Sequence, residues 1–205
     1  KMADFTENVK NVFYFNIAIT VILTLIITLV VLIYVRKSHT RLHNLASNDA
    51  LTGLANRRTF NNVLERTLLT KSSDTTLSII FLDLDNFKSI NDSKGHDVGD
   101  KVLQCLAKLL NEMLRDSDFV ARWGGEEFII LLTGSNIDNA SRLAEKIRAA
   151  IEGNASLQAL AEFPVTASFG VTSAINGDST EAIFKRADRA LYQAKNQGKN
   201  KIITG

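Results

Sequence analysis

The pattern of apolar and polar positions divides the chain into one long apolar segment and a larger region in which helical and strand-like patterns alternate. The segment from Val12 to Val35 has no charged residue and no histidine. A helix of its 24 residues extends roughly 36 Å, whereas the hydrocarbon core of a bilayer is about 30 Å thick. The pattern therefore predicts a transmembrane helix over residues 12–35, preceded by a short segment of residues 1–11 and followed by a helical stalk of residues 36–48.

Charged residues beside the apolar segment predict its orientation. Arg36, Lys37 and Arg41 follow the segment and two lysines precede it, so the positive-inside rule places the residues after it in the cytoplasm. A cleaved signal peptide is the alternative, but its apolar region usually has about 7–15 residues and no small-residue cleavage site follows Val35. We therefore expect a single-pass membrane protein whose larger region is cytoplasmic.

Within the apolar segment, polar residues recur at every fourth position and form one stripe on a helix. They are Asn16, Thr20, Thr24 and Thr28. Such residues can hydrogen-bond to a partner helix across a dimer interface. Alternatively, the threonine hydroxyls donate to carbonyl groups of their own helix, which requires no partner. The sequence leaves both interpretations open.

The region after residue 48 alternates between the periods of helices and strands. Helical spacing of apolar residues predicts helices at 57–70, 98–114, 140–151 and 181–196. Apolar runs and short β-prone segments predict strands at 77–84, 119–122, 128–132, 165–172 and 201–204. The glycine pair Gly124-Gly125 lies between two of these strands and indicates a hairpin. The order of elements predicts an α+β or α/β domain over residues 49–205, with one central sheet flanked by helices.

Composition and charge exclude several classes of protein. The 205 residues have a net charge of +2, of which residues 1–48 contribute +3, so residues 49–205 carry 19 basic and 20 acidic side chains. A nearly neutral domain offers no basic surface for nucleic acid. The single cysteine, Cys105, cannot form an intrachain disulfide, which fits a reducing compartment. Lys1 before Met2 indicates a fragment of a longer chain or a tag remnant.

Carboxylates gather where the predicted strands end. Asp83 and Asp85 lie at the end of the buried strand, and Glu126 and Glu127 follow the glycine pair. Oxygen ligands at strand ends, beside a glycine turn that lets the backbone approach a phosphate, suit Mg²⁺-dependent nucleotide chemistry. Aspartates and glycines are also common turn residues, so either element alone is ambiguous.

The two elements together resemble a known signature. The hairpin sequence, Arg122-Trp123-Gly124-Gly125-Glu126-Glu127-Phe128, resembles that of the GGDEF family of diguanylate cyclases, in its GGEEF form. Further motifs of this family are matched in order by residues 49–58, 83–91, 95–100, 168–171 and 187–195. The resemblance extends from Asp49 to about Ile203. It implies the palm-like α+β fold of the family, with a central mixed or antiparallel sheet, and a bacterial inner membrane as the location of the predicted span.

The resemblance implies a reaction and a metal site. Members of the family condense two GTP molecules into cyclic di-GMP with loss of two pyrophosphates, and each 3′-hydroxyl attacks the α-phosphate of the other nucleotide. A homodimer is implied, because one site holds only one of the two GTP molecules. The metal would be Mg²⁺, or Mn²⁺ in its place. The implied ligands are Asp83, the backbone carbonyl of Leu84, Glu126 and Glu127. Glu126 is also the candidate base for the 3′-hydroxyl.

The resemblance also implies which residues bind the substrate. Lys88 would stabilise charge that develops on the phosphates, and Lys195 and Lys199 would hold them. Asn91 and Asp100 would read guanine, because an aspartate accepts hydrogen bonds from the adjacent N1–H and N2–H₂ groups, a donor pair that adenine lacks. The other implied contacts are His96, Gly124 and Gly125. Taken alone, each lysine would fit a solvated surface, and the histidine a helix cap.

A separate group of residues resembles the product-inhibition site found in many members of the family. It consists of Arg115, Asp118 and Arg142. An arginine offers a planar fork to a phosphate and to the edge of guanine, so these residues would bind cyclic di-GMP. The alternative is a local role, in which Arg115 complements the end of the preceding helix and Asp118 begins a strand.

Two other functions are compatible with the resemblance. One is a non-catalytic receptor for a nucleotide or for cyclic di-GMP, and the other is a related synthase that makes a mixed cyclic dinucleotide. Degenerate relatives usually lose signature residues, whereas the sequence from Gly124 to Phe128 is intact. Asp100 favours GTP over ATP. We therefore expect a membrane-anchored, Mg²⁺-dependent and product-inhibited diguanylate cyclase.

Overall fold

The computed structural model describes residues 14, 16–17, 19–33, 47–70, 72 and 75–205. The chain forms two compact units, Lys1–Ala46 and Ser47–Gly205, which are considered separately. In the first unit, residues 19–33 form a continuous helix. The hydroxyls of Thr20, Thr24 and Thr28 donate hydrogen bonds of 2.7–2.8 Å to the carbonyl groups four residues earlier. The three threonine hydroxyls therefore bond to their own helix, as the interpretation that requires no partner expects.

The prediction of a single-pass inner-membrane protein is wrong. Within the described residues, no helix is long and apolar enough to span a membrane. The ends of the predicted span lie outside the described residues, as does the predicted stalk up to residue 46. Asn48, the last residue assigned to that stalk, forms an isolated bridge with Ala55.

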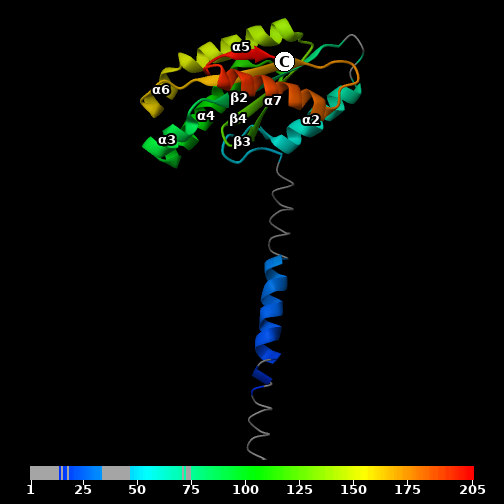
Figure 1. The fold of residues 1–205 in the computed structure, drawn as a ribbon, viewed down its shortest axis with the longest axis vertical. Helices are drawn as coiled ribbons and strands as arrows, with labels where there is room; N and C mark the ends of the chain where they lie inside the picture. The colour runs from blue at the N-terminus through cyan, green and yellow to red at the C-terminus, as the bar shows by residue number, and fades with distance from the viewer. Residues whose placement is uncertain (1–13, 15, 18, 34–46, 71, 73–74) are drawn as a thin grey trace, which may run out of the picture. The chain divides into compact units, whose positions relative to one another are not determined.

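A six-stranded sheet forms the centre of the second unit (Figure 1). In chain order its strands are β1 Ala55–Asn56, β2 Leu77–Leu84, β3 Phe119–Gly124, β4 Glu127–Thr133, β5 Ala167–Ser173 and β6 Ile202–Thr204. Across the sheet the order is β1-β3-β4-β2-β5-β6. The four central strands are antiparallel neighbours, and the edge strands β1 and β6 run parallel to β3 and β5. The sheet is therefore mixed, as predicted.

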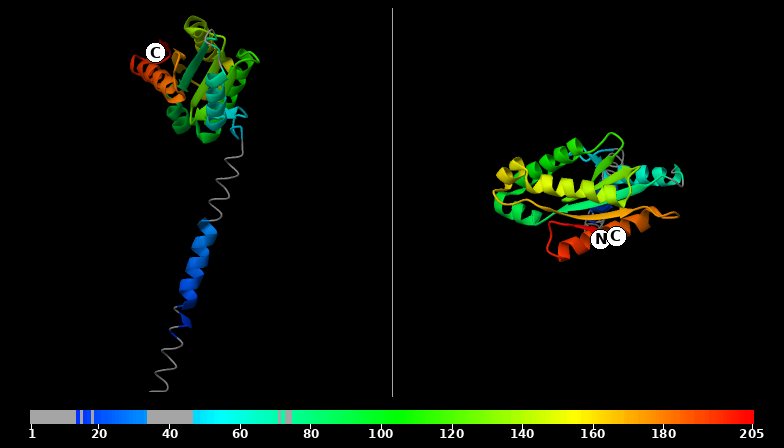
Figure 2. Two further views of the ribbon diagram at one scale, coloured as in Figure 1. Left: turned by 90° about the vertical axis from the view of Figure 1, so that its right-hand side faces the viewer. Right: turned by 90° about the horizontal axis from the view of Figure 1, so that it is seen from above.

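Helices cover both faces of the sheet (Figure 2). They are α2 Arg57–Thr70, α3 Phe87–Lys94, α4 His96–Met113, α5 Ile137–Glu152, α6 Ala155–Ala161 and α7 Thr180–Asn196. Alternation along β2 divides the core, because Ile80 and Leu82 pack with α4, α5 and α6, whereas Ile79 and Phe81 pack with α2 and α7. Every residue of β2 is buried, which explains why its sequence is a nearly continuous apolar run.

Helix α7 approaches strand β5 closely at Gly170. A Cβ atom on Gly170 would lie 2.1 Å from the carbonyl oxygen of Ala187 and 2.4 Å from the amide nitrogen of Leu191. Both atoms belong to the backbone of α7, so no side-chain rotation could make room for it. The glycine therefore sets how closely α7, which carries Lys195, packs on the sheet.

The strands and long helices predicted from the sequence are confirmed, with differences of up to three residues at their ends. The sequence patterns do not predict β1, α3 and α6. Helix α3 buries only Phe87 and Ile90 and is otherwise polar, so its eight residues resemble a loop. It nevertheless carries two of the predicted substrate residues, Lys88 and Asn91.

Candidate active site

The end of β2 lies beside the β3–β4 hairpin. Asp83 is paired in register with Glu127, and the N–H of Leu84 donates a 3.4 Å hydrogen bond to the carbonyl of Glu126. Gly125 in the turn has a φ of 50°, a left-handed conformation that favours glycine. The fold therefore makes neighbours of the four residues that the sequence predicts as metal ligands.

Arg122 holds the hairpin turn in place. Its Nε and Nη2 donate to the carbonyl of Gly125 at 3.0 and 2.7 Å, and its Nη1 donates to the carboxylate of Asp49 at 3.0 Å. Asp49 also accepts hydrogen bonds from the N–H and hydroxyl of Thr52, at 2.9 and 2.7 Å. Burial would raise the pKa of Asp49, but the hydrogen bonds from Thr52 and Arg122 prevail and lower it. The segment that opens the domain is thus tied to the turn that carries the two glutamates.

Replacing Asp49 by Asn is expected to lower the free energy of unfolding at pH 7 by about 1–2 kcal/mol, because charge-assisted hydrogen bonds become neutral ones. A carboxyl group with a lowered pKa in the folded state stabilises the fold above its ordinary value of 3.8, and this stability is lost as the pH falls through the folded value. The difference between wild type and variant should therefore shrink below about pH 4. Urea unfolding at pH 7 and at pH 3 measures the difference in the free energy of unfolding between the two proteins. An equal difference at both pH values would contradict the role of the charge on Asp49.

The two carboxylate oxygens of Asp83 have different surroundings. The residue is 5% exposed, and Oδ2 accepts a 2.6 Å salt bridge from the Lys195 ammonium. Oδ1 is buried and has no hydrogen-bond partner among the residues that the structure describes. Burial raises the pKa of Asp83, Lys195 opposes this, and the charges of Glu126 and Asp85 add to the rise. A buried hydrogen-bond acceptor without a partner is energetically unfavourable unless a cation or a hydrogen-bond donor binds it.

Glu127 shares this crowding of negative charge. Burial and the charge of Asp83 raise the pKa of Glu127, Lys195 opposes the rise, and Asp188 and Glu126 add to it. Within the described ranges, no group of three or more histidine, cysteine, aspartate or glutamate side chains is arranged to hold a metal ion. Mg²⁺ does not require such a group, because it commonly binds one or two carboxylates together with substrate phosphates and water. The neighbouring carboxylates of Asp83 and Glu127, together with the Oδ1 of Asp83 that lacks a partner among the described residues, therefore fit Mg²⁺.

Two of the lysines predicted to bind phosphate lie near the carboxylates. Lys195 pairs with Asp83, and Lys199, in the turn after α7, donates a hydrogen bond to the side-chain oxygen of Asn86 at the start of α3. Lys88 in the first turn of α3 and His96 at the start of α4 are exposed. In the part of the chain that the structure describes, neither forms a hydrogen bond or an ion pair with Asp83 or Glu127, so these two residues do not join the carboxylate group.

The residues predicted to read guanine lie on two successive helices that are joined at Gly95. Asn91 on α3 is half-buried, and Asp100 on α4 is exposed. A Cβ atom on Gly99 would lie only 1.9 Å from Oδ1 of Asn91. The missing side chain at position 99 therefore lets Asn91 reach the turn of α4 that carries Asp100.

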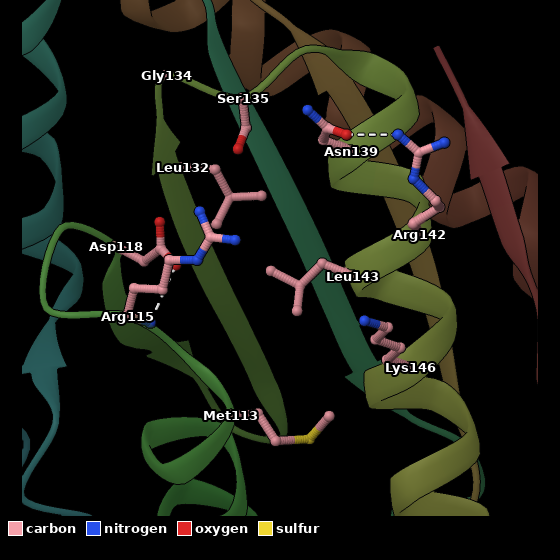
Figure 3. Close-up of a pocket in the computed structure, with 10 residues that line it drawn as sticks. All are labelled: Met113, Arg115, Asp118, Leu132, Gly134, Ser135, Asn139, Arg142, Leu143 and Lys146. Carbon is pink, nitrogen blue, oxygen red and sulfur yellow. Dashed lines mark hydrogen bonds between the residues drawn. The ribbon is translucent and has the colours of Figure 1, made fainter.

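A cavity of about 330 Å³ lies between the turn after α4 and helix α5 (Figure 3). Its lining includes the three residues predicted to bind the product, Arg115, Asp118 and Arg142, together with Lys146. Asp118 accepts a 3.1 Å hydrogen bond from the backbone N–H of Arg115, and Arg142 donates to Asn139. Arg115 and Lys146 reach the cavity from opposite sides (Figure 3). Three cationic side chains against one carboxylate make the cavity suited to an anion.

Two residues without a predicted role, Asn86 and Asn200, also contact the site. The N–H of Asn200 donates to the carboxylate of Asp85 at 3.0 Å, and Lys199 bonds to Asn86. Asn86 and Asn200 have left-handed φ values of 56° and 44°. Asparagine tolerates this conformation better than most residues, which is the one signal in the sequence, but it does not identify the contacts that such a turn makes.

Comparison with known proteins identifies the family. The family model described as "Diguanylate cyclase, GGDEF domain" matches residues 46–201. Diguanylate cyclase DgcM of Escherichia coli K12 is 41% identical over 171 residues, which cover 82% of this chain and 40% of that protein. The chain thus spans about 40% of the length of that curated relative.

Solved structures agree with this assignment. The GGDEF domain of DgcB from Caulobacter crescentus, in complex with cyclic di-GMP, is 32% identical and has a TM-score of 0.71, covering 78% of this chain and 95% of that one. The active GGEEF domain of a diguanylate cyclase from Vibrio cholerae is 38% identical and has a TM-score of 0.63, covering 74% of this chain and 97% of that one. With the hairpin, the carboxylates and the sheet order already described, these matches show that the chain belongs to the GGDEF family of diguanylate cyclases.

Proposed function

We propose that this chain is a diguanylate cyclase, which condenses two GTP molecules into cyclic di-GMP and releases two pyrophosphates. The proposal rests on the buried Oδ1 of Asp83 beside the GGEEF hairpin, which has no hydrogen-bond partner among the described residues. Perturbed carboxylates with an incomplete set of partners are typical of catalytic sites. The similar GGEEF domain from Vibrio cholerae is an active one, which supports catalysis with a glutamate at position 126.

Residues at the end of β2 and in the β3–β4 hairpin would hold Mg²⁺, with Mn²⁺ as a second ion of similar ligand preference. They are Asp83, the carbonyl of Leu84, Glu126 and Glu127. Bound there, the ion would supply positive charge to the triphosphate and to the developing charge of phosphoryl transfer. Lys195 already compensates part of the charge of Asp83 through its 2.6 Å salt bridge.

The side chains around this group would bind the triphosphate and move one proton. Lys195 and Lys199 present point charges to the phosphates, and Lys88 would stabilise the charge of the transition state. The 3′-hydroxyl of one GTP attacks the α-phosphate of the other, and pyrophosphate leaves. Glu126 is the candidate acceptor of the hydroxyl proton. A metal-bound carboxylate is a weak base, so we assign Glu126 first to the metal and second to the proton.

Guanine specificity would come from the helices α3 and α4. The carboxylate of Asp100 can accept from both N1–H and N2–H₂ of guanine, and Asn91 adds a group that can donate and accept. Adenine presents an acceptor at N1 instead, so it would leave the Asp100 carboxylate without its donor pair. The site therefore favours GTP over ATP.

Catalysis would require two copies of the chain. The described residues carry one GGEEF hairpin and one Asp83, which suffice for one nucleotide. Cyclic di-GMP contains two guanylyl units, so the two half-sites must face each other in a homodimer. This geometry makes the rate depend on the concentration of dimer.

Cyclic di-GMP would also bind the cavity of Figure 3 as an inhibitor. Its two phosphates match the excess of cationic groups there, and the guanidinium of Arg115 can bond a phosphate with two parallel donors. The related GGDEF domain of DgcB binds this dinucleotide, which supports the assignment of a ligand though not of a position.

The Arg115→Ala variant is expected to need about tenfold more cyclic di-GMP for half-inhibition, because one charge-assisted contact is lost. Each protein is compared with its own uninhibited rate. Lys108→Ala is the matched control, because Lys108 is an exposed cation of α4 whose nearest acidic partner is Glu112 at 3.9 Å. Equal product sensitivity of Arg115→Ala and wild type would contradict the inhibitory site.

The proposed function is tested by product analysis with GTP and ATP supplied together in the presence of Mg²⁺. A diguanylate cyclase forms only cyclic di-GMP. A mixed cyclic dinucleotide would assign the chain to a different synthase, and no product at concentrations that allow dimers would make it a receptor.

A further inference from the structure

The second carboxylate at the end of β2, that of Asp85, is buried like Asp83 but is fully hydrogen-bonded. It is 5% exposed. Its Oδ1 accepts from the hydroxyl of Ser168 at 2.7 Å, and its Oδ2 accepts from the hydroxyl of Thr166 at 2.8 Å and from the N–H of Asn200 at 3.0 Å. These three donors satisfy both oxygens, whereas Oδ1 of Asp83 has no hydrogen-bond partner in the part of the chain that the structure describes. Asp85 is therefore suited to hold structure in place and not to bind a metal.

The donor from the C-terminal side belongs to a turn in an unfavourable backbone conformation. Lys199 and Asn200 have φ values of 62° and 44°, so two successive residues other than glycine are left-handed. Such a conformation costs of order 1–3 kcal/mol per residue and persists only where the surroundings enforce it. The bond from Asn200 to Asp85 is one such restraint, and the N–H of Lys199 donates to the carbonyl of Ala194 at 3.0 Å as another.

The side chain of Asn200 supplies a third restraint, from helix α5. Its Oδ1 accepts from Nη1 of Arg148 at 2.9 Å, and its Nδ2 donates to Glu152 at 2.9 Å. Arg148 is itself held by Glu145 and Glu152, with contacts of 2.7 and 2.9 Å, and its side chain is only 17% exposed. Asn200 is thus fixed from two sides, by the end of β2 and by α5.

The turn determines where the ammonium group of Lys199 lies. Lys199 precedes Asn200 directly, and its Nζ donates to Oδ1 of Asn86. Asn86 follows Asp85 in the chain and is itself left-handed, with a φ of 56°. Asp85 therefore connects the metal-binding end of β2, the start of α3 and the turn that carries the lysine.

We propose that Asp85, Asn200 and Arg148 are positioning residues, which hold Lys199 where it binds the phosphates beyond the α-phosphate of GTP. The proposal rests on the proposed function, because it takes Lys199 as a phosphate ligand. A flexible lysine placed by its backbone binds a polyphosphate with less loss of conformational entropy than a lysine on a mobile turn. Loss of the restraints should therefore weaken binding of the triphosphate and not binding of the guanosine part.

The test compares the α,β-methylene analogue of GTP, which cannot lose pyrophosphate, with GMP, which lacks the outer phosphates. Affinities are measured by calorimetry with Mg²⁺ on the whole chain. Asn200→Gly keeps the left-handed backbone accessible and removes the bonds to Arg148 and Glu152. Arg148→Gln instead changes the donor of the hydrogen bond that Arg148 makes to Oδ1 of Asn200. Both are expected to bind the analogue about tenfold more weakly and GMP less than about twofold more weakly.

Arg186→Gln is the matched control. Arg186 forms a 2.6 Å salt bridge with Asp178, with 27% and 11% of the two side chains exposed, and it lies on α7 away from the turn. Loss of this salt bridge should lower stability and leave the ratio of the two affinities unchanged.

If Asn200→Gly and Arg148→Gln weaken the binding of the analogue and of GMP equally, or weaken neither, the positioning role is overturned. Binding needs no turnover, so a chain that binds the analogue without making cyclic di-GMP would contradict the proposed function and not this inference.

Discussion

The Asp83→Asn variant is expected to form cyclic di-GMP at least about a hundredfold more slowly than the wild type while its free energy of unfolding changes by no more than about 1 kcal/mol. Burial raises the pKa of Asp83, so the folded state disfavours its charge. An amide of the same shape removes that penalty. Lys195 is 35% exposed and can be solvated when its partner becomes neutral. Urea unfolding without metal and the rate of product formation measure the two effects.

The response to metal gives the same variant a second, independent readout. Mg²⁺ that binds the folded state raises the thermal midpoint of the wild type, and Asp83→Asn should lose most of this shift. Asp85→Asn is the matched control, two residues along the chain. Its amide cannot satisfy all three donors, so it should lose about 2 kcal/mol of stability and retain a stabilising response to Mg²⁺. A wild-type metal response in Asp83→Asn would contradict the site.

The Gly170→Ala variant is expected to lose about 3 kcal/mol or more of stability, and with it most of the activity. The added Cβ would overlap backbone atoms of α7 at 2.1 and 2.4 Å, so the helix must move away from β5. Because α7 carries Lys195, the salt bridge to Asp83 would be displaced as well. Denaturant unfolding measures the loss.

Gly124→Ala serves as the control for stability alone. A Cβ atom on Gly124 meets no atom within 4 Å, so its free energy of unfolding should change by less than about 0.5 kcal/mol. Similar stabilities of Gly170→Ala and wild type would show that α7 does not depend on this close approach.

The fold could be predicted where hydrophobic periodicity is strong. All eight residues of β2 are buried, and its predicted bounds are those observed. Helix α3 has two buried residues in eight, and α6 spans only seven, so neither has a detectable period. The apolar segment shows the opposite error. Its length and lack of charge predict a membrane span, but no helix of the described residues is long and apolar enough to form one.

The candidate site could be predicted as a set of residues but not as a set of contacts. The motifs identify Asp83, Glu126 and Lys195, yet the salt bridge between Asp83 and Lys195 depends on how α7 packs on β5. The bond between Asp85 and Asn200 joins residues 115 positions apart. Such pairings are set by tertiary structure, and a single sequence carries no local signal for them.

The most direct measurement is the stoichiometry of the reaction of the purified chain with GTP and Mg²⁺, with Glu126→Gln in parallel. We expect two pyrophosphates to be released for each cyclic di-GMP formed, and almost no product from Glu126→Gln. We also expect the rate to rise more steeply than in proportion to protein concentration while dimers form. Release of pyrophosphate without cyclic di-GMP, or equal rates for both proteins, would contradict it.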